Sequence, residues 1–217
     1  MKDSGQITAI EVQKRNKKRC SIYLDGEYAF GLDASIVLDH GLRKGDRLDA
    51  DQIQQILLKE ERQKIKESAF RYLAGRAHSE KELRDKLLRK GFERTRVDEV
   101  MGELRRNRFV DDAAFAVQYA RNRLLHKPVG AKRLRQELRQ KGVPEELTET
   151  ALSAAYAERP EEELARELLR RQVDKNQDLP PLQRKKRLSE FLLRRGFEWE
   201  LVRDLVEEAV RESSSMD

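Results

Sequence analysis

Two hydrophobic periodicities divide the chain near residue 60. Before that point, residues 7–12 form an apolar, β-branched run, and residues 20–24 alternate apolar and polar positions as a half-buried strand does. Asp25 and Gly26 supply a turn that tolerates positive φ, and residues 27–31 continue as a further strand. The pattern predicts a small β-rich domain at the N-terminus.

The segments around these strands complete the N-terminal prediction. The basic run at residues 14–19 is expected to form the exposed turn between the first two strands, and residues 34–38 a short helix. From Asp51, a candidate N-cap, the apolar positions change to helical spacing, with Ile53 and Ile56 on one face. The β-rich domain therefore leads directly into a helix.

From residue 62 onward the apolar spacing is helical, and one pattern occurs three times, at 79–91, 130–142 and 184–196. Each copy contains a leucine pair four residues apart, followed by a basic residue and a glycine. The leucine pairs are Leu83/Leu87, Leu134/Leu138 and Leu188/Leu192. Helical repeats of this kind bury their apolar faces against neighbours and form arrays with broad binding surfaces.

Capping signals place the helices of each copy. Ser79 with Glu82 forms a capping box, Asp112 is expected to cap a helix from residue 113, and glycines end the middle helices. The predicted helices are 65–76, 79–90, 94–106, 113–125, 130–141, 145–156, 161–174, 182–195 and 199–211.

We therefore predict a mainly α protein, an elongated tandem array of three three-helix repeats preceded by a small β-rich N-terminal domain. The expected boundaries are 1–60 for the β-rich domain with its connecting helix, 61–110, 111–157 and 158–212 for the repeats, and 213–217 for a disordered tail.

Composition narrows the class of protein. Of the 217 residues, 40% are charged and 38% apolar, which suits thin helical modules with large solvated faces. The net charge of +6 favours nucleic acid or an acidic protein surface as partner. A single cysteine, Cys20, excludes an internal disulfide and fits a reducing compartment. No signal peptide or membrane-spanning run is recognisable, so we expect a cytoplasmic protein without membrane contact.

Catalytic patterns are not apparent. His40, His78 and His126 are scattered without partners at metal-ligand or nucleophile spacing, and Cys20 lies among apolar neighbours as a structural thiol does. No glycine-rich phosphate loop is present. We expect a non-enzyme with no catalytic residue, no metal and no cofactor.

The charge distribution suggests a binding surface instead. Residues 113–141 carry eight bases and one acid, Glu137, whereas residues 143–169 carry eight acids and two bases. Lys132, Arg135 and Arg139 share a helix face that could neutralise phosphates or meet an acidic protein. The predicted surface comprises Arg121, Arg123, Lys127, Lys132, Arg133, Arg135, Arg139 and Lys141. An ordinary solvated helix face is the alternative interpretation, and aromatic stacking residues are not interleaved with these bases.

Two further basic patches and one junction stand out. The patches are Lys14, Arg15, Lys17, Lys18 and Arg19 in the first domain, and Arg184, Lys185, Lys186 and Arg187 in the third repeat. Phe109, Asp111, Asp112, Phe115 and Tyr119 form the junction between the first two repeats. Phe115 and Tyr119 should pack inward and the aspartates should cap the following helix, so a structural joint is the preferred interpretation.

Three segments, in this order, resemble the RecX family of bacterial recombination regulators. They are Ser79-Glu-x-Glu-Leu-x-x-Lys-Leu-x-x-Lys-Gly91, Phe109-Val-Asp-Asp112-x-x-Phe115-Ala116-x-x-Tyr119, and residues 130–142. Residues 7–31 resemble the extension found on many family members, and the third repeat is the loosest match. The resemblance covers nearly the whole chain.

The resemblance implies a monomeric modulator of the RecA recombinase, active in DNA repair, recombination and the SOS response. Its expected partners are the RecA filament and DNA, directly or through RecA, and its expected effect is to suppress strand exchange, ATPase and coprotease activity. An autonomous DNA-binding protein and a helical scaffold for another partner stay open as alternatives. The sequence leaves open the sign of the regulation, whether filament ends or the lattice are bound, and which residues contact RecA. It also leaves open what the β-rich domain adds and whether DNA is bound without RecA.

Overall fold

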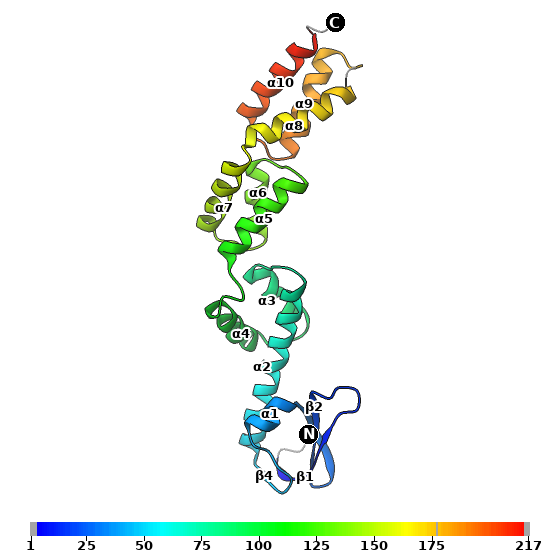
Figure 1. The fold of residues 1–217 in the computed structure, drawn as a ribbon, viewed down its shortest axis with the longest axis vertical. Coiled ribbons are helices and arrows are strands. Elements are labelled where there is room, and N and C mark those ends of the chain that lie inside the picture. The colour runs from blue at the N-terminus through cyan, green and yellow to red at the C-terminus, as the bar shows by residue number, and fades with distance from the viewer. Residues whose placement is uncertain (1–3, 177, 215–217) are drawn as a thin grey trace. The chain divides into compact units, whose positions relative to one another are not determined.

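The computed structural model describes residues 4–176 and 178–214 of the chain. They form two compact units, one within residues 4–76 and 84–106 and the other within residues 77–83 and 107–214. Figure 1 shows strands at the start of the chain, followed by helices, with α2 (Ala50–Gly75) leading out of the β-rich part. The predicted mainly α class, with three three-helix repeats after a small β-rich domain, is confirmed.

The N-terminal sheet is antiparallel and has the strand order β3-β2-β1-β4. Strands β1 (Gly5–Val12), β2 (Arg19–Leu24) and β3 (Glu27–Asp33) confirm the three predicted strands. Strand β4 (Arg47–Leu48) was not predicted, because two residues are too few to show an alternating pattern. One face of the sheet carries the buried side chains and packs against helices α1 (Ala34–Asp39) and α2.

Helix α2 is longer than the sequence pattern predicted. Separate helices were expected to begin at Asp51 and at residue 65, but α2 is continuous, because neither glycine nor proline occurs between residues 51 and 74. Asp49, not Asp51, is the N-cap, and it forms a capping box with Gln52. The helix buries Ile53 and Ile56 in the core of the β-rich domain.

Helix α2 carries a buried carboxylate that bonds to the sheet. Glu60 is 2% exposed, and its oxygens accept from Asp33 N at 2.6 Å and pair with Arg19 at 2.7 Å and Lys64 at 3.2 Å. A buried carboxylate is stable only when paired and hydrogen-bonded. These bonds fix α2 against β2 and β3.

The first repeat continues from α2 through α3 (Glu80–Arg89) and α4 (Arg94–Arg106). Arg62 and Lys66 of α2 both pair at 2.5 Å with Glu103 of α4. The hydrogen bonds from Lys66 and Arg62 lower the pKa of Glu103.

The second repeat contains α5 (Asp112–His126), α6 (Ala131–Gln140) and α7 (Glu145–Glu158). The third contains α8 (Glu161–Val173), a 3₁₀ turn (Asp174–Asn176), α9 (Pro181–Arg194) and α10 (Trp199–Ser214). Their buried residues form one hydrophobic cluster. Helix α10 includes residues 213 and 214 of the expected tail, and residues 215–217 lie outside the described part.

The middle helix of each repeat ends as predicted. Gly91, Gly142 and Gly196 have φ of 86°, 81° and 86°, which is the left-handed conformation of a helix-ending glycine. The leucine pairs that precede them are at most 1% exposed. The repeated pattern therefore encodes a buried helix face and a fixed helix end.

Candidate functional site

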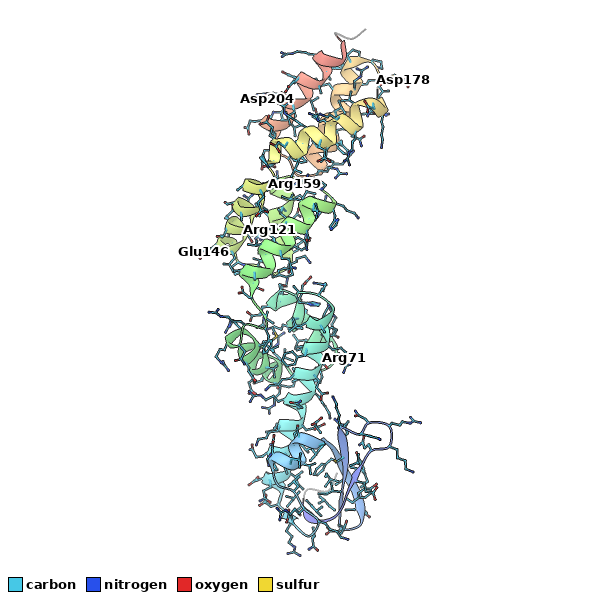
Figure 2. The ribbon with its side chains drawn as sticks, in the orientation of Figure 1. Arg71, Arg121, Glu146, Arg159, Asp178 and Asp204 are labelled. Carbon is cyan, nitrogen blue, oxygen red and sulfur yellow. The ribbon has the colours of Figure 1, made fainter. Side chains whose placement is uncertain are left out.

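The bases of residues 113–141 and the acids that follow them at 143–169 are not kept apart in the folded chain. Helix α7 packs against both α5 and α6, so acids of the second segment meet bases of the first. Arg135 bonds to Glu149 at 2.5 and 3.1 Å, and Arg121, labelled in Figure 2, pairs with Glu158. The expectation of a face with almost no compensating acid is therefore wrong for Arg121 and Arg135.

Glu137, the one acid of the basic segment, is the centre of a polar network. Arg123 donates to it twice, at 2.8 and 3.0 Å, Arg133 donates at 3.1 Å, and the Tyr119 hydroxyl donates at 2.9 Å. Burial opposes ionisation, but the hydrogen bonds from Arg123, Tyr119 and Arg133 still lower the pKa of Glu137. Burial, together with the bond to Glu137, raises the pKa of Tyr119 to about 12.

Lys141, also predicted as a binding residue, bonds instead to the first turn of α3. Its ammonium lies 2.7 Å from Glu82 and 4.8 Å from the Tyr119 ring centroid. The Tyr119 ring stacks on the buried Phe115 ring at 5.9 Å, as the predicted inward packing requires. Lys141 and Arg123 therefore stabilise the second repeat and its junction, and the charge of each is paired within the protein.

Three predicted cations carry the accessible charge. Lys127, Lys132 and Arg139 are exposed, and in the described part of the chain none of them forms an ion pair. We call these three residues the open cations. Arg121, Arg133 and Arg135 lie on the same repeat and are between 38% and 51% exposed although each is paired. The predicted surface is thus smaller than expected and consists of open cations beside partly neutralised arginines.

A concentration of arginines lies where the second and third repeats meet. Arg133 donates to Arg194 O at 3.2 Å, and Arg195 donates to Pro128 O at 3.1 Å. Burial and the nearby Arg123 and Arg133 lower the pKa of Arg195. Glu137 bonds to Arg123 and Arg133 but not to Arg195. These three arginines together therefore add to the positive potential near Lys127.

The junction between the first and second repeats is built on the N-terminus of α3. The Ser79 hydroxyl donates to Lys141 O at 2.6 Å, and Glu80 N donates to the Asp112 carboxylate at 2.8 Å. Asp111 caps α5 by accepting from Ala113 N and Ala114 N, as predicted, whereas the same prediction for Asp112 is wrong. Asp112 therefore caps the helix of the preceding repeat, while Phe109 is 53% exposed.

The junction between the second and third repeats follows the same scheme on the N-terminus of α6. Gly130 N donates to Arg195 O at 2.9 Å, and Ala131 N donates to the Glu161 carboxylate at 2.8 Å. Asp112 and Glu161 are the first residues of α5 and α8. At both junctions, the first residue of the next repeat caps the middle helix of the repeat before it.

The other predicted basic patches are divided by the structure. Lys14, Arg15, Lys17 and Lys18 are exposed on the loop between β1 and β2, whereas Arg19 is paired with the buried Glu60. In the third repeat, Lys186 and Arg187 are exposed, Lys185 pairs with Glu207 at 2.7 Å, and Arg184 is buried and donates to Leu179 O.

The cysteine and the histidines noted in the sequence lie in different surroundings. Burial raises the pKa of the Cys20 thiol, with a further contribution from Asp33, so the reactive thiolate is disfavoured. His78 is buried in the segment between α2 and α3, whereas His126 is exposed at the end of α5. Within residues 4–176 and 178–214, no group of three His, Cys, Asp or Glu side chains is arranged to hold a metal ion. No helix among these residues has the length and apolar character to cross a membrane.

Comparison with known protein families gives four matches in chain order. The regulatory protein RecX N-terminal domain matches residues 5–49. The first, second and third three-helix domains of RecX match residues 66–104, 111–152 and 160–206. Together these matches cover most of the chain, including the third repeat that resembled the family least.

Individual relatives agree with the family matches. The regulatory protein RecX of Clostridium botulinum (strain Alaska E43 / Type E3) is 30% identical over 208 residues, covering 95% of this chain and 97% of the relative. The protein of the same name from Halalkalibacterium halodurans is 37% identical over 196 residues, covering 88% and 73%.

Solved structures show the same fold. A crystal structure of regulatory protein RecX has a TM-score of 0.75 and 30% identity, and the match covers 94% of this chain and 98% of that one. RecX from Lactobacillus salivarius, at 20% identity, has a TM-score of 0.63 over 70% of this chain and supports the fold alone.

Proposed function

Because this chain belongs to the RecX family of regulatory proteins, we propose that it binds the RecA recombinase on DNA and inhibits it without catalysing a reaction. The observation that carries the proposal is the match of all four RecX domains in order. The inhibited activities are strand exchange, the DNA-dependent ATPase and the coprotease function. The protein thereby limits recombination, repair and the SOS response in the cytoplasm.

The open cations supply the contact chemistry of this proposal. Lys127, Lys132 and Arg139 are exposed and carry charge that the described residues do not neutralise. Such groups bind the acidic surface of a protein or the phosphates of its DNA, and both interactions weaken with salt. The protein acts by occupying the filament or destabilising its end, which lowers the number of active recombinase subunits.

The test is the ATPase activity of the cognate RecA on excess single-stranded DNA, titrated with this protein at fixed salt. We expect inhibition at well below one molecule per RecA, because one regulator then affects several subunits. An effect that requires enough protein to coat the DNA would contradict filament regulation and favour an autonomous DNA-binding protein.

A pair of variants tests the surface. Replacing the three open cations by glutamate should raise the inhibitory concentration about tenfold or more, since three contacts become repulsive. The matched control replaces Arg43, Lys44 and Arg47, three exposed bases of the β-rich domain, and should inhibit like the wild type. Equal loss in both variants would show that net charge matters and that this surface does not.

The alternative candidate is an autonomous DNA-binding protein, which the same open cations favour. It predicts tight binding to DNA without RecA and no sub-stoichiometric effect on the ATPase. A helical scaffold for another partner predicts neither DNA binding nor RecA inhibition.

A further inference from the structure

The outward face of the N-terminal sheet presents aromatic and polar side chains. Ile22 and Leu24 of β2 and Leu32 of β3 are fully buried on the inner face of the sheet. Side chains that alternate with them along these strands therefore face outward. On that outer face Tyr23 pairs across the strands with Tyr28, and Ser21 pairs with Gly31. The two tyrosine rings meet edge to face at 6.0 Å, and Tyr28 is 60% exposed.

The glycine in β3 makes room for this arrangement. A Cβ at Gly31 would lie 3.5 Å from the Tyr28 hydroxyl, 3.5 Å from an Arg19 guanidinium nitrogen and 3.1 Å from the Gln13 amide nitrogen. The Tyr28 ring therefore extends along the strand toward Arg19 and Gln13. A glycine within a strand commonly marks a place where another group approaches closely.

A cationic loop adjoins the same face. Lys14, Arg15, Lys17 and Lys18 are exposed and have no ion pair in the described part of the chain. The loop is held in shape, because Lys18 N donates to the Asn16 side chain at 3.1 Å and Arg19 N donates to Asn16 O at 3.0 Å.

The acids near this face are few. Glu11 lies beside Tyr23, whose pKa it raises, and Asp25 and Glu27 lie at the turn that joins β2 to β3, at the opposite end of these strands from the cationic loop. Asp33 is engaged in capping α1. The loop end of the sheet therefore has a local excess of positive charge, and the Tyr28 ring, whose backbone follows Glu27 at the turn end, extends toward it as far as Gly31.

We propose that this face binds single-stranded nucleic acid, with a base stacked on Tyr28 and phosphates bound by Lys14, Arg15, Lys17 and Lys18. Exposed aromatic rings beside a basic groove are the common means of holding unpaired bases, and a duplex keeps its bases stacked and out of reach. This site goes beyond the proposed function and does not depend on it, because it uses neither the repeats nor a recombinase.

The experiment uses the full chain with its open cations replaced by glutamine, so that the second repeat contributes little. Binding of a labelled oligothymidine of about 12 nucleotides is measured by fluorescence anisotropy over a range of salt concentrations. Replacing Arg15, Lys17 and Lys18 by glutamine should weaken binding about tenfold and reduce the salt slope by about 2. The control with Arg43, Lys44 and Arg47 replaced by glutamine should change affinity by less than about twofold.

Substitution of Tyr28 separates stacking from charge. Tyr28→Thr removes the ring but introduces a β-branched residue that also favours strands, and it should weaken single-strand binding about tenfold. Tyr28→Phe should stay within about twofold of the parent. Equal weakening by the loop and control triples, or equal effects of Tyr28→Thr on single strand and hairpin duplex, would overturn the proposal.

A measurement on the unaltered protein guards against misfolded variants. Photocross-linking with an oligonucleotide containing 5-iodouracil should label the peptide that contains Tyr28. Labelling confined to residues 113–142 would assign DNA binding to the second repeat and refute this site. If the RecA assay fails while Tyr28 is labelled, only the proposed function is lost.

Discussion

The two repeat junctions share the same helix capping but differ in how closely the backbones of adjacent repeats approach each other. At the first junction, the Ser79 side chain bridges to Lys141 O, and the nearest groups to Gly142 are side-chain atoms of Lys81. At the second, Gly130 occupies the position of Ser79, and a Cβ there would lie 2.3 Å from Gly196 O and Phe197 N. Both junctions contain side-chain hydrogen bonds, but the second also contains a close backbone contact that only glycine permits.

The largest effect is expected from Gly130→Ala. Its backbone φ of −78° suits alanine, so the clash with Gly196 and Phe197 is the only cost, and we expect a loss of about 3 kcal/mol or more in the free energy of unfolding. Urea denaturation measures it. Gly75→Ala is the control, because nothing lies within 4 Å of its Cβ position. Similar stabilities of the two variants would refute close packing at the second junction.

Glu137→Gln tests the polar network around Glu137. This network orients Arg133 toward the second junction and holds Tyr119 beneath Lys141 at the first junction. We expect a loss of about 2 kcal/mol at pH 7, because Arg123 and Arg133 lose a charged partner. The folded state lowers the pKa of Glu137, so its contribution is present above the ordinary value of 4.5 and is lost as the pH falls through the folded pKa. The difference between wild type and variant should therefore shrink in acid, and a constant difference would exclude this linkage.

Ser79→Ala should cost about 1 kcal/mol, since the hydroxyl both donates to Lys141 O and accepts from Glu82 N. Thermal unfolding measures this loss. Ser79→Thr, which retains the hydroxyl, is the matched control. A loss in the alanine variant as large as that of Gly130→Ala would remove the distinction between the two junctions.

The smallest effect is expected from Glu161→Gln at the second junction. Burial raises the pKa of Glu161, so ionisation costs stability as the pH rises through the folded pKa. The glutamine amide oxygen can still accept from Ala131 N, so stability at pH 7 should be unchanged or higher by up to about 0.5 kcal/mol. Glu161→Ala, which cannot accept, should be less stable than either.

Local patterns were sufficient to predict much of the fold. The leucine pairs and Gly91, Gly142 and Gly196 defined the middle helices because burial and helix ending are encoded within a few residues. The junction of α2 with the first repeat was harder, since a continuous helix and two adjacent helices have the same apolar spacing there. Asp112 was read as a cap of its own helix, because nothing local reveals the α3 N-terminus beside it.

The candidate surface was predictable only in part. A run of bases identified the second repeat, but the partners of Arg121 and Arg135 lie on α7, which follows in the chain and folds back. Sequence position alone therefore could not separate Lys132 and Arg139, which stay open, from Arg123 and Lys141, which bond within the protein. Whether the open cations contact RecA or DNA stays a prediction.

The helix caps at the two junctions make the first two repeats depend on the segment that follows each of them. Asp112 caps α3 and Glu161 caps α6, so the middle helices of the first two repeats receive these caps from a segment synthesised later. In the third repeat Arg184 stands where Ser79 and Gly130 stand, and α9 begins before it at Pro181. Deleting the third repeat would thus expose the backbone donor of Ala131, whereas deleting the β-rich domain would leave both caps in place. Capping of these two helix N-termini therefore runs in one direction along the chain, with the earlier helix dependent on the later segment.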